Sequence, residues 1–351
     1  MKYNSLGSTD LNVSAICLGT MTYGAQNTQQ QAHDQLSLAV EHGVNFIDTA
    51  ELYPAPASEN TSTLSEQYIG NWLQHQDRET LIIATKVVGP APKKWIGYIR
   101  GGPTLAPGQI ETALNDSLKR LRTDYIDLYQ IHWPSRNTNY FGKLGYEYGK
   151  DKHDNPIKET LETLARLVDS GKIKHIGVSN ETPWGLHTYL QSANEFNLPI
   201  IAAVQNPYCL LNRTFEVGMA EFSHRSNISL LAYSPLAGGT LSGKYLKGIE
   251  PANARLTLHR NYFYRYTTDR ATEAIEKYVH IAKRHSLDPA AMALAFVSRQ
   301  AFVASTIIGA TNTRQLQDNI RSVDVTLTDE VIKDIQQVHN ENPNPVLEQC
   351  Q

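Results

Sequence analysis

The sequence has few cysteines and no long apolar run. Its 351 residues include Cys17, Cys209 and Cys350, which form no CxxC pair and, being three, no disulfide framework. No uninterrupted apolar run reaches the ~18 residues that would span a bilayer. The opening MKYNSLGSTD lacks the apolar core of a secretory signal. We therefore expect a cytoplasmic protein in a reducing compartment, with no membrane partner.

Charge of one sign is not in excess either. The chain has 32 lysines and arginines against 35 aspartates and glutamates, a net charge of -3. A chain without basic excess gives no electrostatic footprint for nucleic acid, so we expect none as a partner. Hydrophobic residues make up 41% of the chain, enough for a sizeable core. A small neutral or anionic substrate fits this composition.

Short β-rich runs alternate with longer stretches whose apolar residues recur at helical spacing. The continuous apolar character of the runs is typical of strands covered on both faces. The alternation predicts parallel βα units. We expect an α/β fold, a (β/α)8 TIM barrel, formed by residues 1–351 as a single domain. The eight runs are 15–20, 45–50, 81–87, 127–133, 175–180, 202–208, 229–236 and 305–311.

The intervening stretches and connections add detail to this prediction. Residues 30–43 and 109–124 have apolar residues at helical spacing, and Gly43 is suited to a helix C-cap. Four connections that follow strands are longer than a barrel requires, so we expect them at the catalytic mouth. They are 51–63, 88–107, 135–156 and 237–268.

Four polar side chains, Asp48, Tyr53, Lys86 and His132, lie at the ends of predicted strands. A tyrosine loses its proton only near pH ~10 in water, so an enzyme that uses it as an acid needs a cation beside it. Lys86 can be that cation, and Asp48 can hold it protonated and oriented. His132 can donate a hydrogen bond to a bound carbonyl. Polar residues at carboxyl strand ends are typical of the catalytic face of a barrel.

These residues carry a family resemblance. The segment FIDTAELY, the lysine of ATK and the histidine of QIHWP resemble the catalytic tetrad of the aldo-keto reductases, a superfamily that includes the β subunits of voltage-gated potassium channels. Further matches run from LGTM, with Gly19 and Thr20, to GATNTRQLQDN, which ends at Asn319. The resemblance implies a carbonyl reductase with Tyr53 as the general acid. It also implies that the opening segment forms a small hairpin closing the barrel bottom.

The resemblance implies a nicotinamide cofactor without a GxGxxG fingerprint. Ser179, Asn180 and Gln205 would bind the carboxamide, and Tyr233 would stack on the ring. Arg255 would clamp the pyrophosphate. The pyrophosphate would also be surrounded by Ser234, Leu236 (through its backbone), Gly239 and Lys244. The adenosine end would be contacted by Thr311, Gln315, Asp318 and Asn319. Gly19, Thr20 and Gly309 would also bind the cofactor.

The choice between NADP(H) and NAD(H) depends on one departure from the family pattern. Many aldo-keto reductases have a lysine and an arginine for the 2′-phosphate where this chain has Gly309 and Gln315. Arg314 lies one position away and is a candidate replacement. The more similar relatives with a Gly-Ala-Ser/Thr motif still use NADP(H), so we expect NADP(H). Substrate specificity would lie in the mouth loops, where the candidate pocket residues are Tyr23, Trp95, Trp133 and Tyr140.

Other functions were weighed against carbonyl reduction. His132 has no HxH or HExxH spacing, so we expect no metal, and Ser179 and Ser234 lie in no GxSxG motif. Asp124 and Asp127 form a close carboxylate pair, which we place at the barrel bottom rather than in a glycosidase site. A nucleotide-binding regulatory subunit, similar to the channel β subunits, and a non-redox barrel enzyme are the alternatives. We expect a monomer or weak homo-oligomer.

Overall fold

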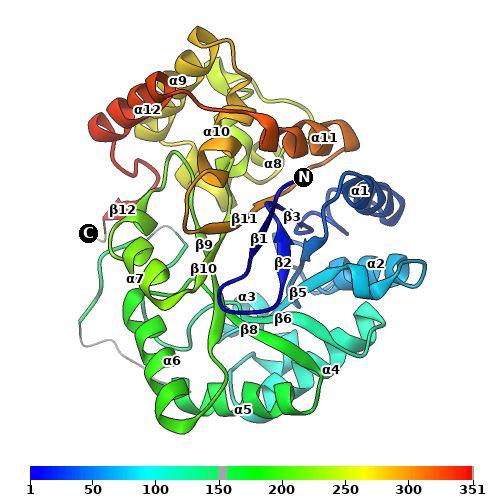
Figure 1. The fold of residues 1–351 in the computed structure, drawn as a ribbon. Helices are drawn as coiled ribbons and strands as arrows, with labels where there is room; N and C mark the ends of the chain where they lie inside the picture. The colour runs from blue at the N-terminus through cyan, green and yellow to red at the C-terminus, as the bar shows by residue number, and fades with distance from the viewer. Residues whose placement is uncertain (142, 149–155, 350–351) are drawn as a thin grey trace.

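Eight parallel strands close into a barrel at the centre of the protein (Figure 1). The structure is a computed structural model that describes residues 1–141, 143–148 and 156–349. Neighbouring strands pair in chain order around the barrel, and β10 and β11 pair to bring β11 beside β3. The strands are β3 (Ile16–Gly19), β4 (Phe46–Asp48), β5 (Ile82–Val87), β6 (Ile126–Ile131), β8 (Ile173–Ser179), β9 (Ile201–Pro207), β10 (Ser229–Tyr233) and β11 (Val303–Ile308).

The predicted (β/α)8 barrel is therefore confirmed, and each of the eight predicted runs overlaps one strand. The run 229–236 extends three residues beyond its strand, which ends at Tyr233. Ser234 follows with a φ of 55°, a left-handed conformation that turns the chain out of the sheet. A local apolar pattern does not reveal such a turn.

Helices surround the barrel and bury their apolar sides against it. Gly43 follows the first of them with a φ of 82°, as the C-cap prediction required. No helix in the described ranges is long and apolar enough to cross a membrane. The helices are α1 (Gln29–Glu41), α2 (Leu64–Leu73), α3 (Lys93–Ile96), α4 (Pro107–Leu121), α5 (Ile157–Asp169), α6 (Pro183–Phe196), α7 (Met219–Ser226), α8 (Arg255–His259), α9 (Asp269–Arg284), α10 (Pro289–Ser298), α11 (Thr313–Arg321) and α12 (Asp329–Glu341).

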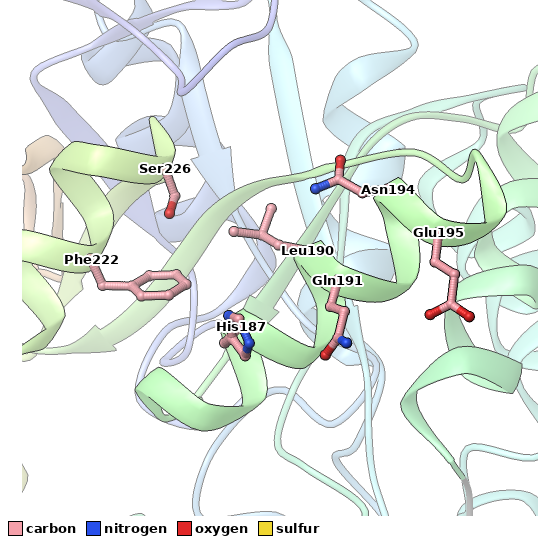
Figure 2. A pocket seen from close by; sticks show the side chains of 7 residues that line it. All are labelled: His187, Leu190, Gln191, Asn194, Glu195, Phe222 and Ser226. Carbon is pink, nitrogen blue, oxygen red and sulfur yellow. The ribbon is translucent and has the colours of Figure 1, made fainter.

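The outer face between α6 and α7 has an open depression of about 630 Å³ (Figure 2). His187 and Leu190 of α6 face Phe222 of α7 across it. None of the predicted catalytic or cofactor residues lines this depression.

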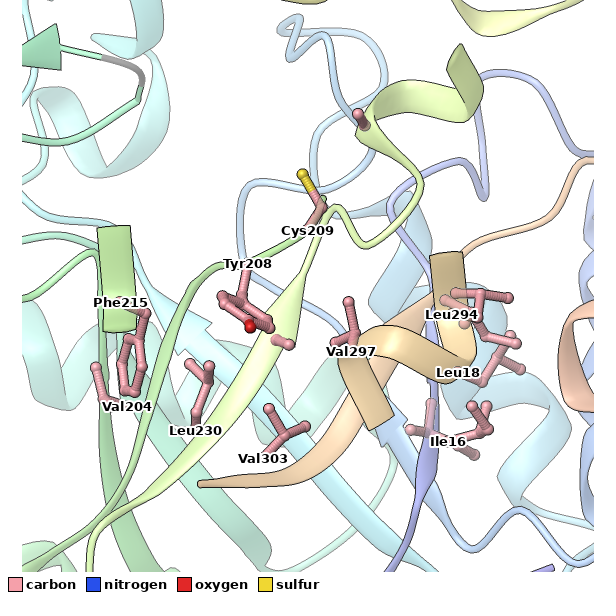
Figure 3. Packing of buried hydrophobic residues seen from close by; sticks show 14 of the residues in the cluster. Ile16, Leu18, Val204, Tyr208, Cys209, Phe215, Leu230, Leu294, Val297 and Val303 are labelled. Carbon is pink, nitrogen blue, oxygen red and sulfur yellow. The ribbon is translucent and has the colours of Figure 1, made fainter. Parts of the chain in front are cut away.

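The hydrophobic core has two layers, because successive residues of a strand point to opposite faces. Ile16 and Leu18 of β3 point outward and pack with Leu294 and Val297 of α10 (Figure 3). Cys17, between them, belongs to the second layer inside the barrel. A continuous apolar strand therefore contributes to both layers, because its side chains point alternately outward and into the barrel.

The inner layer changes from apolar to polar along the barrel axis. On β5 the inward positions are occupied by Ile82, Ala84 and then Lys86, and on β6 Leu128 is followed by Gln130. Parallel strands have their carboxyl ends at one face, so the polar residues gather there. The polar face of the barrel thus arises because every second residue of a strand points inward, and the inward residues become polar at the carboxyl ends of the strands.

The opposite end of the barrel is closed by the N-terminal hairpin. Strands β1 (Tyr3–Ser5) and β2 (Asn12–Ser14) pair antiparallel, and Leu6 packs into the inner apolar layer. The predicted hairpin is confirmed. The long connections follow β4, β5, β6 and β10 as expected. Within the third, residues 142 and 149–155 lie outside the described residues, and β7 (Lys143–Leu144) pairs with β12 (Glu348–Gln349).

Close packing of α2 on α4 generates a stability prediction. A Cβ on Gly70 of α2 would collide with the backbone carbonyl of Arg120 on α4. Overpacking of this kind typically costs about 1–3 kcal/mol, so Gly70→Ala should lower the free energy of unfolding by at least that much in urea titration. The control is Gly108→Ala in α4, where a Cβ meets nothing within 4 Å. That helical substitution should be neutral or stabilising by roughly 0.5–1 kcal/mol. Equal stabilities of the two variants would contradict the observed helix contact.

Candidate active site

A buried ion pair lies at the carboxyl ends of β4 and β5. The Lys86 ammonium is 2.6 Å from Oδ2 of Asp48, and neither side chain is more than 2% exposed. Lys86 also donates to the Thr49 carbonyl at 2.8 Å. A buried charge is tolerated when it is paired and hydrogen-bonded, and both conditions are met here. Asp48 thus orients Lys86 as predicted from the sequence.

The second oxygen of Asp48 is held by two amides. Gln205 Nε2 donates to Oδ1 at 2.8 Å and Gln130 Nε2 donates at 3.2 Å. The resemblance implied that Gln205 binds the nicotinamide carboxamide, and within the protein its amide nitrogen already supports Asp48. Sequence reasoning missed Gln130. Its position two residues before His132 on β6, at inward spacing, was the signal that could have found it.

Tyr53 lies in the loop after β4, directly above the ion pair. Lys86 Nζ is 4.8 Å from the centroid of the Tyr53 ring. Burial raises the pKa of the Tyr53 phenol well above its ordinary value, and the Asp48 charge raises it further. The expected net lowering of the Tyr53 pKa is wrong for this environment, because burial and the Asp48 charge outweigh the nearby Lys86 ammonium. Tyr53 is consequently a protonated phenol at neutral pH.

His132 completes the group at the end of β6. Its ring contacts the Tyr53 ring edge-on, with 5.7 Å between centroids. Burial lowers the pKa of His132 well below its ordinary value, and Lys86 lowers it further, so the imidazole is neutral. Its buried Nδ1 has no hydrogen-bond partner among the described residues. A neutral imidazole can donate one hydrogen bond to a bound oxygen.

The residues predicted to meet the nicotinamide form a network beside His132. Asn180 Nδ2 donates to the His132 carbonyl at 2.9 Å, and Tyr233 donates to Asn180 Oδ1 at 2.7 Å. Ser179 Oγ donates to the Gln205 carbonyl at 2.7 Å. The ends of β6, β8, β9 and β10 are tied together by these bonds. The structure therefore brings the four predicted residues together.

Asp48, Tyr53 and His132 border one cavity of about 1490 Å³, together with the four residues of the network beside His132. Gly19 lies on its wall, whereas the neighbouring Thr20 is buried and donates to the Asp48 carbonyl at 3.0 Å. Thr20 supports the site without reaching the cavity. Lys86 lies beneath the floor, fully buried. A cavity of this size accommodates a dinucleotide-sized ligand and a substrate.

The aromatic predictions are only partly confirmed. Trp95 and Trp133 line the cavity and stack with 5.6 Å between ring centroids. Tyr23 does not line it: the ring is fully buried in the outer core and its hydroxyl faces Gln35 at 3.4 Å. Tyr140 does not line it either, because its ring packs edge-on against Phe141, which takes the wall position.

Two cations lie on the cavity wall near glycines. A Cβ on Gly239 would be 3.2 Å from Lys244 Nζ, and a Cβ on Gly309 would be 3.6 Å from Arg255 Nη2. Neither cation has a carboxylate partner within the described part of the chain. Burial lowers the pKa of Lys244, and the Arg255 charge lowers it further. Two like charges without a counter-ion favour a bound anion.

Ser234 and Leu236 line the same wall, between β10 and the turn of η4 (Ala237–Ser242). The strap that follows, residues 251–265, crosses the cavity. Its backbone at Asn253 accepts a hydrogen bond from Gln26 Nε2 at 3.0 Å, which ties it to the loop after β3. Sequence reasoning assigned Arg255 in this strap but missed its aromatic and cationic lining residues.

The predicted adenosine end lies at the start of α11. Asn312 caps this helix, its side chain accepting from Gln315 N at 2.9 Å. The Thr311 hydroxyl donates a hydrogen bond to the side-chain oxygen of Gln315 at 3.0 Å. The four predicted residues, Thr311, Gln315, Asp318 and Asn319, all border the cavity.

The cation at the adenosine end differs from the one considered in the sequence. Arg314 does not border the cavity, whereas Arg321, one helix turn past Asp318, borders it. Arg321 is therefore a further candidate, besides Arg314, for the basic residue at the predicted adenosine end. Helical spacing alone does not separate the two arginines, because positions 314 and 321 are both neighbours of 318 on a helix.

A second ion pair, missed from the sequence, positions the loop that carries Tyr53. Glu51 is almost fully buried and accepts from Arg100 Nε at 2.8 Å and from Val88 N at 3.2 Å. This pair links the loops after β4 and β5, which form the wall containing Trp95.

The remaining alternatives find little structural basis. Asp127 accepts from Arg78 at 2.6 Å and from the Ile83 amide at 2.9 Å, at the end of the barrel away from the cavity. The barrel-bottom interpretation of this carboxylate is confirmed. Within the described ranges, no group of three or more His, Cys, Asp or Glu side chains is placed to hold a metal ion.

Comparison with known proteins extends the resemblance. Protein tas of Escherichia coli (strain K12) is 52% identical over 340 residues, 97% of this chain and 98% of that protein. The uncharacterized oxidoreductase YrpG of Bacillus subtilis (strain 168) is 32% identical over 337 residues, 95% of this chain and 94% of its own. A probable voltage-gated potassium channel subunit beta of Arabidopsis thaliana is 29% identical over 351 residues, 98% of each chain.

The family model described as "Aldo/keto reductase family" matches residues 15–340, which include every barrel strand and all four tetrad positions. The chain therefore belongs to the aldo/keto reductase family.

Proposed function

We propose that the protein is an NADP(H)-dependent reductase that converts an aldehyde or ketone to an alcohol, with Tyr53 as the general acid. The observation that carries the proposal is the buried Lys86–Asp48 pair beneath Tyr53 and His132, at the floor of a large cavity. The family membership supports the reaction class. The identity of the acid and of the cofactor is our proposal.

The donor set of the cavity fits a dinucleotide. Lys244 and Arg255 supply two positive charges where the family places a pyrophosphate, and Gly238 and Gly239 allow close backbone approach. Arg321 supplies a charge near the adenosine end. When bound, the nicotinamide supplies the hydride. Three cations without carboxylate partners among the described residues favour the more highly charged NADP(H).

The protein's own groups handle the charge that develops on the carbonyl oxygen. Neutral His132 donates a hydrogen bond to that oxygen, and Tyr53 delivers its proton. Lys86, under the Tyr53 ring, stabilises the phenolate that this transfer leaves behind. Trp95 and Trp133 exclude water from the floor of the cavity, which strengthens each of these electrostatic interactions.

A nucleotide-binding regulatory subunit is the second candidate. Its support is the likeness to the channel subunit beta of Arabidopsis thaliana, which extends over 98% of this chain. Such a subunit needs the cofactor site and has no requirement for fast turnover. Measured reduction of simple aldehydes at a rate of about 1 s⁻¹ or more, within the ordinary range for enzymes, would favour the reductase.

The first test of the function removes the proposed acid. Tyr53→Phe deletes one oxygen and leaves the ring on Lys86, so cofactor binding should persist while carbonyl reduction falls by about 10²–10⁴-fold. The measurement is single-turnover oxidation of NADPH in the presence of an aldehyde. Tyr140→Phe is the matched control, because this phenol does not line the cavity, and it should keep wild-type activity. A Tyr53→Phe variant with more than about a tenth of wild-type turnover would assign the proton to another group.

The second test concerns the cofactor. The protein should bind NADPH more tightly than NADH, by about tenfold or more, because each charge-assisted hydrogen bond to the 2′-phosphate contributes roughly 1.5–3 kcal/mol. Nicotinamide fluorescence titration gives both dissociation constants. Arg321→Gln should reduce the NADPH preference and leave NADH binding unchanged, whereas Arg314→Gln should change neither. Equal constants for the two nucleotides in the wild type would refute the preference.

A further inference from the structure

Arg265 is a cation on the cavity wall that the proposed reaction and its cofactor do not use. It lies in η6 (Arg260–Tyr266), at the end of the strap, and its side chain is partly buried. Its guanidinium is 4.6 Å from the Tyr266 ring centroid and donates to the Tyr266 hydroxyl at 3.2 Å. Across the described ranges it has no carboxylate partner. Most of its five donors therefore lack a protein acceptor.

The neighbours of Arg265 place it toward the reacting end of the cavity. Its charge interacts with the phenols of Tyr233 and Tyr262, where it opposes the rise in pKa that burial causes. Tyr262 in turn interacts electrostatically with Tyr53, the proposed acid. All four side chains border the same cavity. Arg265 therefore borders the same cavity as Tyr233, whose hydroxyl donates to Asn180 in the network beside His132.

The charges of the cavity leave Arg265 without a counter-ion. Lys244 and Arg255 lie by Gly239 and Gly309, at the proposed pyrophosphate position. Among the described residues, three carboxylates border the cavity: Asp48 is paired with Lys86, Asp288 accepts from the Ala291 amide as a helix cap, and Asp318 lies on α11 at the predicted adenosine end. A partly buried guanidinium facing an apolar, aromatic space gains most from a planar carboxylate, which it can bind through two hydrogen bonds.

We propose that Arg265, with Tyr262 beside it, binds the carboxylate of the carbonyl substrate, so that the preferred substrate is an aldehyde or ketone that also carries a carboxylate. The proposal rests on the proposed reductase function and specifies its substrate class. Arg265 is then a specificity-determining residue: it holds the far end of the substrate while the carbonyl lies at Tyr53 and His132.

The experiment compares an acid with its neutral ester. The probes are 3- and 4-carboxybenzaldehyde and their methyl esters, which share shape and carbonyl reactivity and differ in charge. The wild type should have the higher kcat/KM for one of the acids over its ester. Arg265→Gln should lower kcat/KM for that acid by about 10- to 100-fold, as expected for lost hydrogen bonds to a charged group. The ester values and the NADPH dissociation constant should stay within about twofold, which is small beside that effect.

Two further variants give the comparison its controls. Arg265→Lys keeps the charge without the planar fork and should restore part of the acid preference. Arg260→Gln removes an exposed arginine of the same element, one that pairs with Glu250 at 3.3 Å and does not border the cavity, and should leave all constants unchanged. Urea unfolding of each variant shows whether the strap substitution has altered the fold.

Binding separates this proposal from the reductase function. Trp95 and Trp133 line the cavity, so their fluorescence reports ligand entry without turnover. If neither acid nor ester is reduced, the reductase function fails; tighter binding of the acid by wild type than by Arg265→Gln would still support the carboxylate site. Equal loss for acid and ester, a weaker NADPH affinity in Arg265→Gln, or equal wild-type affinity for acid and ester would overturn it.

Discussion

The Lys86–Asp48 ion pair is the interaction on which the site depends. Both charges are buried, and removing a carboxylate or an ammonium from water costs several kcal/mol after relaxation, so each needs its partner and further hydrogen bonds. The Thr49 carbonyl, Gln130 and Gln205 supply them. This requirement explains why the inward residues around the ion pair are polar although the rest of the barrel interior is apolar. It also explains why these polar residues lie on strands that neighbour or face β4 and β5.

The same pair defines the electrostatics above it. Burial and the Asp48 charge keep the proton on Tyr53, and burial and the Lys86 charge keep His132 neutral. These are the protonation states required of a proton donor and a neutral hydrogen-bond donor. Farther from the floor the cavity wall changes character, with Lys244, Arg255 and Arg265 lacking carboxylate partners among the described residues. The floor of the cavity can bind a polarised carbonyl, and the wall farther from the floor can bind anions.

The strands and the tetrad were predictable because their signals are local. Apolar runs give the strands, and Asp48, Lys86 and His132 stand at their carboxyl ends. Residues whose role depends on which way a loop turns were not predictable: Tyr23 packs in the outer core and Tyr140 behind Phe141, although both follow strands. Gln130 and the Glu51–Arg100 pair were missed because their partners are distant in sequence. The direction of the Tyr53 pKa shift depends on burial, which no motif records.

The most direct measurement is the pH dependence of single-turnover carbonyl reduction in the wild type, Lys86→Met and Asp48→Asn. A raised pKa keeps Tyr53 protonated and a lowered pKa keeps His132 neutral, so the wild-type rate should be level between pH ~6.5 and ~10, the ordinary pKa values of histidine and tyrosine. Lys86→Met should lose more activity than Asp48→Asn, which retains the cation. A fully active Lys86→Met with the wild-type profile would show that the pair is a structural salt bridge and would contradict the proposed chemistry.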